Sequence, residues 1–178
     1  MFLYRFIFNT VLGWKLEGDF SPQIKKSIVI VVPHTSWHDF YLGVFTRGIL
    51  NTPINWVGKK ELFTWPFGYY FRYMGGAALD RTSGQNKVDA IAQIFNDNEE
   101  FRMAMAPEGT RKKVDIWKTG YYYIAQKANV PIIPVAFDYE HKVVRIGKPY
   151  YITNDIEKDT EFLRSFFKGI KGKNPEYS

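Results

Sequence analysis

The stretch SIVIVVPHTSWHDF, residues 27–40, decides the fold that we expect for this chain of 178 residues. Its first half is an unbroken apolar run rich in β-branched residues, which is typical of a strand covered on both faces. His34 stands at the end of this run, and Asp39 follows five residues later, where a helical pattern begins. The stretch therefore predicts a buried strand, a turn and a helix, with a histidine and a carboxylate beside the turn.

Extended and helical patterns alternate on both sides of this stretch. Further strands are expected within residues 15–23, 54–57, 77–80, 101–107, 130–139 and 142–150. Helices are expected over 36–50, 83–100, 119–129 and 155–173, with a short one within 65–76. This alternation predicts a single α/β domain over residues 16–178, with a largely parallel central sheet flanked by helices.

Composition narrows the partners that such a domain could have. The formal net charge of +6 favours an anionic partner: lipid headgroups, a phosphorylated substrate or nucleic acid. Aromatic residues make up 18% of the chain, more than a core of this size needs, which favours contact with a bilayer interface. Because cysteine is absent, disulfides, thiolate zinc ligands and a cysteine acyl-enzyme are excluded.

The first fourteen residues, MFLYRFIFNTVLGW, are apolar but too short to span a bilayer. We expect residues 1–15 to form a short amphipathic helix at the membrane interface, with Arg5 and Lys15 at headgroup level. Its apolar anchors would be Phe2, Phe6, Phe8 and Trp14. The alternative is a first helix that packs on the core of the domain. The interfacial interpretation predicts a cytoplasmic protein, peripheral at the inner face of the cell membrane.

Polar residues follow several of the predicted strands. These residues are His34, the pair Lys59 and Lys60, Arg81, and the run Glu108 to Arg111. In parallel sheets, ligands bind beyond the carboxyl ends of the strands. We therefore expect these residues to gather on one rim of the sheet.

His34 and Asp39 could act together as a general base and its orienting partner. A carboxylate that holds one imidazole nitrogen fixes the tautomer, so that the other nitrogen can take a proton from an alcohol. The alternative is a helix-capping aspartate beside a surface histidine. The spacing of His34 and His38 would also suit a metal, but Pro33 places His34 outside any helix and no third ligand is evident, so no metal is predicted.

The loop PEGTRKK, residues 107–113, is the second polar cluster. Gly109 allows a positive φ or a close backbone approach, and Thr110 offers a hydroxyl. The guanidinium of Arg111 can bind phosphate through two N–H groups, and Arg81 could supply a second guanidinium. Adjacent cations could also form a plain solvated patch or contact nucleic acid.

Taken together, these motifs resemble a known family. The segments HTSWHD (34–39), GGAALDR (75–81), APEGTR (106–111) and VPIIPVAF (130–137) are similar, in order, to the four blocks of the glycerolipid acyltransferases, the 1-acylglycerol-3-phosphate acyltransferase-like superfamily. The H-x4-D and EGTR blocks are specific as a pair. The resemblance implies the glycerol-3-phosphate acyltransferase-like fold.

The resemblance also implies a reaction. A fatty acyl group would pass from acyl-CoA or acyl carrier protein, as co-substrate and with no other cofactor, to a hydroxyl of a lysophospholipid such as 1-acylglycerol-3-phosphate. His34 would be the general base and Asp39 its orienting partner, with no acyl-enzyme. The substrate-binding residues would be Lys59, Arg81, Glu108, Gly109, Thr110 and Arg111. We further expect backbone N–H groups at the start of the helix after His34 to hold the oxyanion.

Some features leave the acceptor and the mode of action open. Trp37 and His38 are bulky within the H-x4-D block, so the acceptor could instead be an amino-acid lipid. The segment WPFGYYFRYM, residues 65–74, could touch the membrane or pack in the core. A non-catalytic peripheral lipid-binding protein and a metal-assisted hydrolase remain as other classes. Nucleic acid is not expected as a partner.

Overall fold

The computed structural model describes residues 2–79 and 86–178, and in this part the chain forms one mixed sheet. Its strands lie in the order β1-β7-β6-β2-β5-β3-β4, and every neighbouring pair is parallel except β6 with β7. The strands are β1 (Lys15–Glu17), β2 (Lys26–Val32), β3 (Asn55–Lys59), β4 (Gly76–Leu79), β5 (Phe101–Met105), β6 (Ile132–Asp138) and β7 (Val143–Ile146). The prediction of a largely parallel α/β sheet is confirmed.

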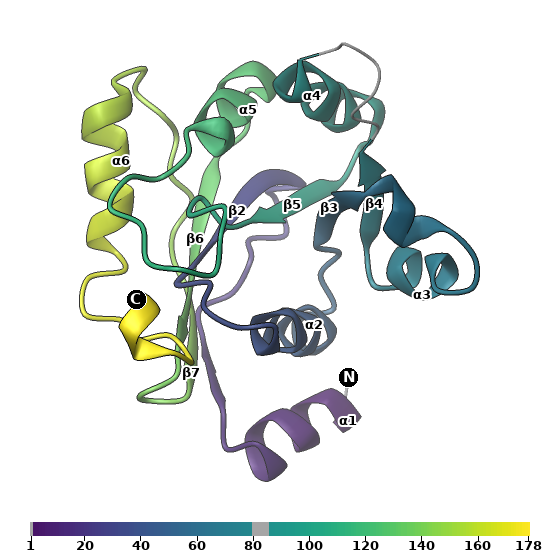
Figure 1. Cartoon of the computed structure of the whole chain (residues 1–178), viewed down its shortest axis with the longest axis vertical. Coiled ribbons are helices and arrows are strands. Elements are labelled where there is room, and N and C mark those ends of the chain that lie inside the picture. The colour runs from purple at the N-terminus through teal and green to yellow at the C-terminus, as the bar shows by residue number, and fades with distance from the viewer. Residues whose placement is uncertain (1, 80–85) are drawn as a thin grey trace.

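Helices cover both faces of this sheet (Figure 1). On one face lie α4 (Lys87–Asp97), α5 (Gly120–Ala128) and α6 (Ile156–Ser165), and on the other lie α1 (Phe2–Arg5), α2 (His38–Leu50) and α3 (Gly68–Tyr73). Shorter pieces are the π-helix η1 (Phe6–Val11) and the 3-10 helices η2 (Lys60–Phe63) and η3 (Pro175–Tyr177). None of the helices in these ranges has the length and apolar character needed to cross a bilayer.

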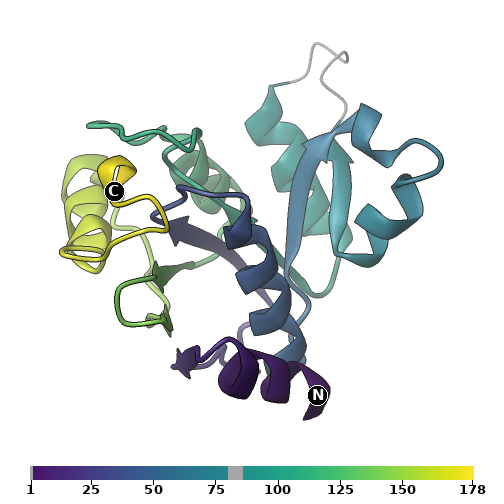
Figure 2. The ribbon, with the colours of Figure 1, turned by 60° about the horizontal axis from the view of Figure 1, so that its bottom comes forward.

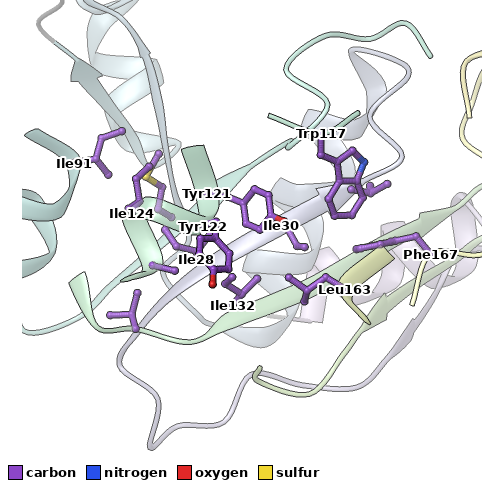
Figure 3. Close-up of a cluster of buried hydrophobic side chains, with 14 of the residues drawn as sticks. Ile28, Ile30, Ile91, Trp117, Tyr121, Tyr122, Ile124, Ile132, Leu163 and Phe167 are labelled. Carbon is purple, nitrogen blue, oxygen red and sulfur yellow. The ribbon is translucent and has the colours of Figure 1, made fainter. Parts of the chain in front are cut away.

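Strand β2 lies at the centre because its side chains are apolar in both directions. Ile28 and Ile30 join the core under α4 and α5, and Val29 joins the core on the face of α2. Figure 3 shows Ile28 and Ile30 beside Tyr121 and Tyr122 of α5. Each fully buried isoleucine or valine contributes roughly 1.5–3 kcal/mol. This burial fixes the end of β2, and therefore the position of His34.

The last helix is shorter than the predicted 155–173, since α6 ends at Ser165. Gly169 has a φ of +80°, which breaks the helical path. Phe167 and Ile170 are buried against the core in the irregular segment that follows. The apolar residues beyond Ser165 therefore pack as a loop and do not extend the helix.

The N-terminal segment divides between the two predicted roles. Phe8 and Trp14 are buried in the core on the α2 face, so the prediction that they dip into a bilayer is wrong. Phe2 and Phe6 are exposed, by 84% and 48%. The segment lies beside α2 (Figure 2). The ring of Tyr4 packs against Gly48 of that helix. Two of the four predicted anchors therefore belong to the protein's own core.

The aromatic segment around α3 is divided in the same way. Phe71 packs with Phe63 and Trp56 in a compact aromatic cluster. In contrast, the outer face exposes Trp65, Phe67, Tyr69 and Tyr73. Core packing and an exposed aromatic surface are both present, on opposite sides of one short helix.

Candidate active site

The loops that follow β2 and β5 meet because these strands are parallel neighbours. The backbone N–H of His34 donates to Oε2 of Glu108 at 2.8 Å, which joins the two loops directly. Glu108 is buried, and burial raises the pKa of its carboxyl, while the N–H and imidazole of His34 oppose the rise. Glu108 thus binds the backbone of the His34 turn, a contact different from the substrate contact that the sequence predicts.

Asp39 lies in the first turn of α2 and its side chain is only 1% exposed. Its Oδ2 lies 3.0 Å from Nδ1 of His34 and accepts the N–H groups of Thr35 and Ser36, each at 2.9 Å. The carboxylate therefore closes the turn and holds the imidazole at the same time. Helix α2 has no side-chain cap, so Asp39 stabilises the turn before the helix and does not act as the capping aspartate of the alternative prediction.

The other oxygen of Asp39 has a partner from a distant part of the chain. Tyr139, which follows β6, donates its hydroxyl to Oδ1 of Asp39 at 2.7 Å. Burial, together with the neighbouring carboxylate, raises the pKa of Tyr139 far above its ordinary value. The phenol therefore stays protonated and remains a donor to Asp39.

Two backbone N–H groups of the turn between β2 and α2 are bound by Asp39. The N–H groups of Thr35 and Ser36 both point to the carboxylate of Asp39. A hydrogen that is given to a buried carboxylate is not available to a developing oxyanion. Thr35 and Ser36 precede α2, which begins at His38, so the oxyanion role expected of N–H groups at the start of the helix stays a prediction.

The loop after β5 brings Arg111 to the site. Gly109 has a φ of +65°, a left-handed conformation that favours glycine. Arg111 and Thr110 are both exposed, and Arg111 lines the same pocket as His34 and Asp39.

The remaining predicted rim residues belong to neighbouring strands. Lys59 ends β3, which lies next to β5, and its backbone is paired with Leu79 of β4. Arg81 lies outside the described residues. The carboxyl ends of β2, β5 and β3 thus lie in a row. His34 follows β2, Glu108 follows β5, and Lys59 is the last residue of β3.

A pocket of about 340 Å³ opens beside His34, between α2 and the sheet. Polar groups come from His34, Asp39, Thr46, Arg47, Asn55 and Arg111, and the other lining side chains are apolar. The apolar lining comes from Phe20, Val29, Val31, Phe40, Val44, Ile54, Trp56, Met74, Ala104, Met105, Val135 and Phe137. Gly43 of α2 leaves open space on this wall, because a Cβ there would meet nothing within 4 Å.

His38 does not join His34 in a metal site. Its Nδ1 lies 2.9 Å from the hydroxyl of Ser36, and its ring lies 4.0 Å from that of Trp37. Across residues 2–79 and 86–178, no group of three His, Cys, Asp or Glu side chains is arranged to hold a metal ion. Trp37 is 54% exposed and contacts Tyr41 edge to face, so the two form an exposed aromatic pair beside the His34 turn.

Residues 15–138 match the model of the family described as Acyltransferase. The chain belongs to this family. The resemblance seen in the H-x4-D and EGTR blocks is thereby confirmed.

Individual relatives within the family carry one name. The chain is 33% identical over 113 residues to the 1-acyl-sn-glycerol-3-phosphate acyltransferase of Escherichia coli K12, covering 60% of this chain and 45% of the relative. The enzyme of the same name from Haemophilus influenzae is 34% identical over 99 residues, and the match covers 52% of this chain and 41% of the relative. The enzyme of that name from Saccharomyces cerevisiae is 29% identical over 159 residues, and the match covers 76% of this chain and 50% of the relative. The chain thus spans half or less of the length of these relatives.

The fold agrees with a solved structure. The 1-acyl-sn-glycerophosphate (LPA) acyltransferase PlsC from Thermotoga maritima matches 93% of this chain and 73% of its own, with a TM-score of 0.63 and 21% identity. At this level of identity the match shows a shared fold. It confirms the predicted acyltransferase-like architecture.

Two contacts of this acyltransferase-family site were missed by the sequence analysis. Tyr139 is 100 residues away from Asp39 along the chain. Asn174 donates its backbone N–H to Oγ1 of Thr35 at 3.2 Å and its side-chain amide to the carbonyl of Thr35 at 3.0 Å. A tyrosine directly after a buried strand next to β2 was a usable signal, but nothing in the sequence indicates the contact of Asn174.

Proposed function

We propose that the protein is an O-acyltransferase that moves a fatty acyl group from a thioester to a hydroxyl of a lysophospholipid such as 1-acylglycerol-3-phosphate. The observation that carries this is the His34–Asp39 pair beside an apolar pocket. Nδ1 of His34 is bound to the carboxylate, so Nε2 is the nitrogen that remains to take a proton.

The reaction is a direct transfer. Nε2 of His34 takes the proton of the acceptor hydroxyl while its oxygen attacks the thioester carbonyl. When the tetrahedral intermediate collapses, the C–S bond breaks and the imidazolium returns the proton to the leaving thiolate. Asp39 stabilises the imidazolium between the two steps.

The pocket suits an acyl chain at this site. Each methylene removed from water contributes about 0.8 kcal/mol, so an apolar wall gains more from a longer chain until the space is filled. Arg111 lines the pocket with His34, and its guanidinium would bind the phosphate of the acceptor. The predicted roles of Lys59, Arg81 and Thr110 in binding the substrate stay part of this proposal.

The proposal extends to the membrane and to the donor. Phe2, Leu3 and Phe6 are exposed beside Arg5, the composition expected of a segment at a lipid interface. The protein would lie peripherally at the inner face of the cell membrane, where lysophospholipid is present. Its donor would be acyl-CoA or acyl carrier protein, with an amino-acid lipid as the alternative acceptor.

Thiol release and product mass test the proposal. The purified protein is incubated with 1-acylglycerol-3-phosphate in mixed micelles and with acyl-CoA or acyl carrier protein donors. We expect thiol release matched by a diacyl product, and a loss of about 10²–10⁴-fold in kcat in His34→Ala. His141→Ala is the matched control, because His141 pairs with Asp138 at 2.9 Å away from the pocket. Vesicle binding without thiol release from any donor would instead indicate a lipid-binding protein.

A further inference from the structure

Tyr139 occupies a position that the reaction described above leaves without a role. Its hydroxyl donates to Oδ1 of Asp39, while His34 and the two backbone N–H groups of the turn all bind Oδ2. The carboxylate is therefore held from two directions. Rotation of the carboxylate about its own axis would break the Tyr139 bond and the Oδ2 bonds together.

The ring of Tyr139 is fixed by the N-terminal segment. Trp14 meets it edge to face, with centroids 4.9 Å apart and planes at 87°. Trp14 is itself buried beside Phe8, and the backbone N–H of Tyr139 donates to the carbonyl of Lys171 at 2.9 Å. The phenol ring is thus held near Asp39 by contacts with two segments that are far apart in sequence.

We propose that Tyr139 is a positioning residue for the His34–Asp39 pair and that Trp14 holds the ring of Tyr139 in place. This inference rests on the proposed function, in which His34 is the base. A carboxylate with both oxygens bound keeps the imidazole in one tautomer and one orientation, which is the condition for proton transfer from a bound hydroxyl. Tyr139 does not touch the substrate in this account, and it acts through Asp39.

Loss of the same contact would change the negative charge beside the imidazole of His34. Among residues 2–79 and 86–178, the charged or titratable groups that contact His34 or line its pocket are Asp39 and Arg47 of α2, Glu108 and Arg111 of the loop after β5, and Tyr139 through Asp39. The hydroxyl of Tyr139 draws negative charge toward Oδ1. Without it, more charge stays on Oδ2 beside the imidazole, so the imidazolium form of His34 is favoured.

The variant Tyr139→Phe tests the positioning role. We expect kcat to fall about tenfold while KM for both substrates stays within twofold, and the acid limb of the rate profile to move to higher pH. Tyr150→Phe is the matched control, because Tyr150 donates to the buried carboxylate of Asp159 at 2.6 Å, remote from the pocket. The control should lower the melting temperature by a similar amount and leave kcat and the pH profile unchanged.

A measurement without turnover separates this inference from the proposed function. The ring nitrogens of His34 are followed by NMR from pH 5 to 9, with the signal assigned from its loss in His34→Gln. We expect the midpoint in Tyr139→Phe to lie about half a pH unit above that of the unsubstituted protein. An unchanged or lower midpoint overturns the positioning role, whether or not the protein turns over. An absence of thiol release with a raised midpoint would overturn the proposed function alone.

Trp14→Leu provides a second variant with the hydroxyl of Tyr139 intact. If Trp14 seats the ring, kcat falls in the same direction as in Tyr139→Phe, and the double variant is no slower than Tyr139→Phe alone. Additive losses would show that Trp14 does not act through Tyr139. Far-ultraviolet circular dichroism and the melting temperature establish that the variants compared are folded.

Discussion

Two buried aspartates of this protein, Asp39 and Asp159, each have four hydrogen-bonding partners, but of the two only Asp39 binds an imidazole. Asp159 of α6 is 0% exposed and accepts four hydrogen bonds, from the hydroxyls of Tyr122 and Tyr150 and from the N–H and hydroxyl of Thr153. Asp39 of α2 also has four partners, but one of them is the imidazole of His34, which is 28% exposed. A buried and fully bonded carboxylate is therefore not in itself a sign of chemistry. What distinguishes Asp39 is a partner that can exchange protons beside a pocket.

The electrostatics of Asp159 show what such a carboxylate does when all its partners are fixed donors. Burial opposes ionisation, but the hydrogen bonds from Tyr150, Thr153 and Tyr122 outweigh it, and the pKa of Asp159 is lowered. The same contacts and burial raise the pKa of Tyr122 and of Tyr150 to about 12. All the partners keep one protonation state near neutral pH, and the cluster serves to join α6 to α5 and to the 150–153 segment.

Replacing each aspartate by asparagine should separate the two roles, and the largest effect is expected at Asp39. The introduced side-chain amide would present either an N–H or a carbonyl to Nδ1 of His34, so the tautomer needed at Nε2 is no longer fixed. We expect Asp39→Asn to lower kcat by about 10²–10⁴-fold, measured as thiol release. A fall of less than threefold in a folded variant would mean that the His34–Asp39 contact is structural.

The reverse pattern is expected at the other aspartate. Asp159→Asn replaces one acceptor oxygen by a donor amide that faces the hydroxyls of Tyr122 or Tyr150, so at least one buried group loses its partner. We expect the free energy of unfolding to fall by about 2–4 kcal/mol, measured by urea denaturation, with kcat unchanged. A loss of kcat at a temperature where the variant is fully folded would contradict the contrast between the two sites.

The pH dependence of stability should sharpen the same contrast. Because the folded pKa of Asp159 lies below its unfolded value, its contribution is complete above the unfolded pKa of about 3.9 and is lost as the pH falls through the folded pKa. The stability difference between the unsubstituted protein and Asp159→Asn should therefore be constant from pH 5 to 7 and shrink below pH 4. Urea titrations across this pH range measure the stability difference. A difference that grows as the pH falls would contradict the prediction.

The fold was predictable because its signals are local and repeated. The apolar run of β2 and the alternation of strand and helix patterns specify a parallel sheet, whose carboxyl ends then gather His34, Glu108 and Lys59. The pairing of His34 with Asp39 was also local, since a single turn joins them.

The missed features depend on the order of strands and on what covers a face. Tyr139 contacts Asp39 only because β6 lies beside β2. The hydropathy pattern of a sequence does not reveal which strands are neighbours in the sheet. Phe8 and Trp14 could not be assigned to core or membrane, because an aromatic face gains similar free energy from burial against protein or against lipid. The contacts of Asp39 with the N–H groups of Thr35 and Ser36 were also missed, because they depend on how the turn before α2 is closed.

The smallest predicted effect concerns the pocket, which is the other feature that Asp39 has and Asp159 lacks. Arg111 lines this pocket, whereas Lys113 of the same loop is exposed outside it. If the guanidinium binds the acceptor's phosphate, Arg111→Gln should raise KM for 1-acylglycerol-3-phosphate about tenfold and change kcat by less than threefold. Lys113→Gln, which removes the same charge two residues away, should change KM by less than twofold. Equal effects in the two variants would mean that the loop acts through its net charge, and the anion site would then not be part of the His34 pocket.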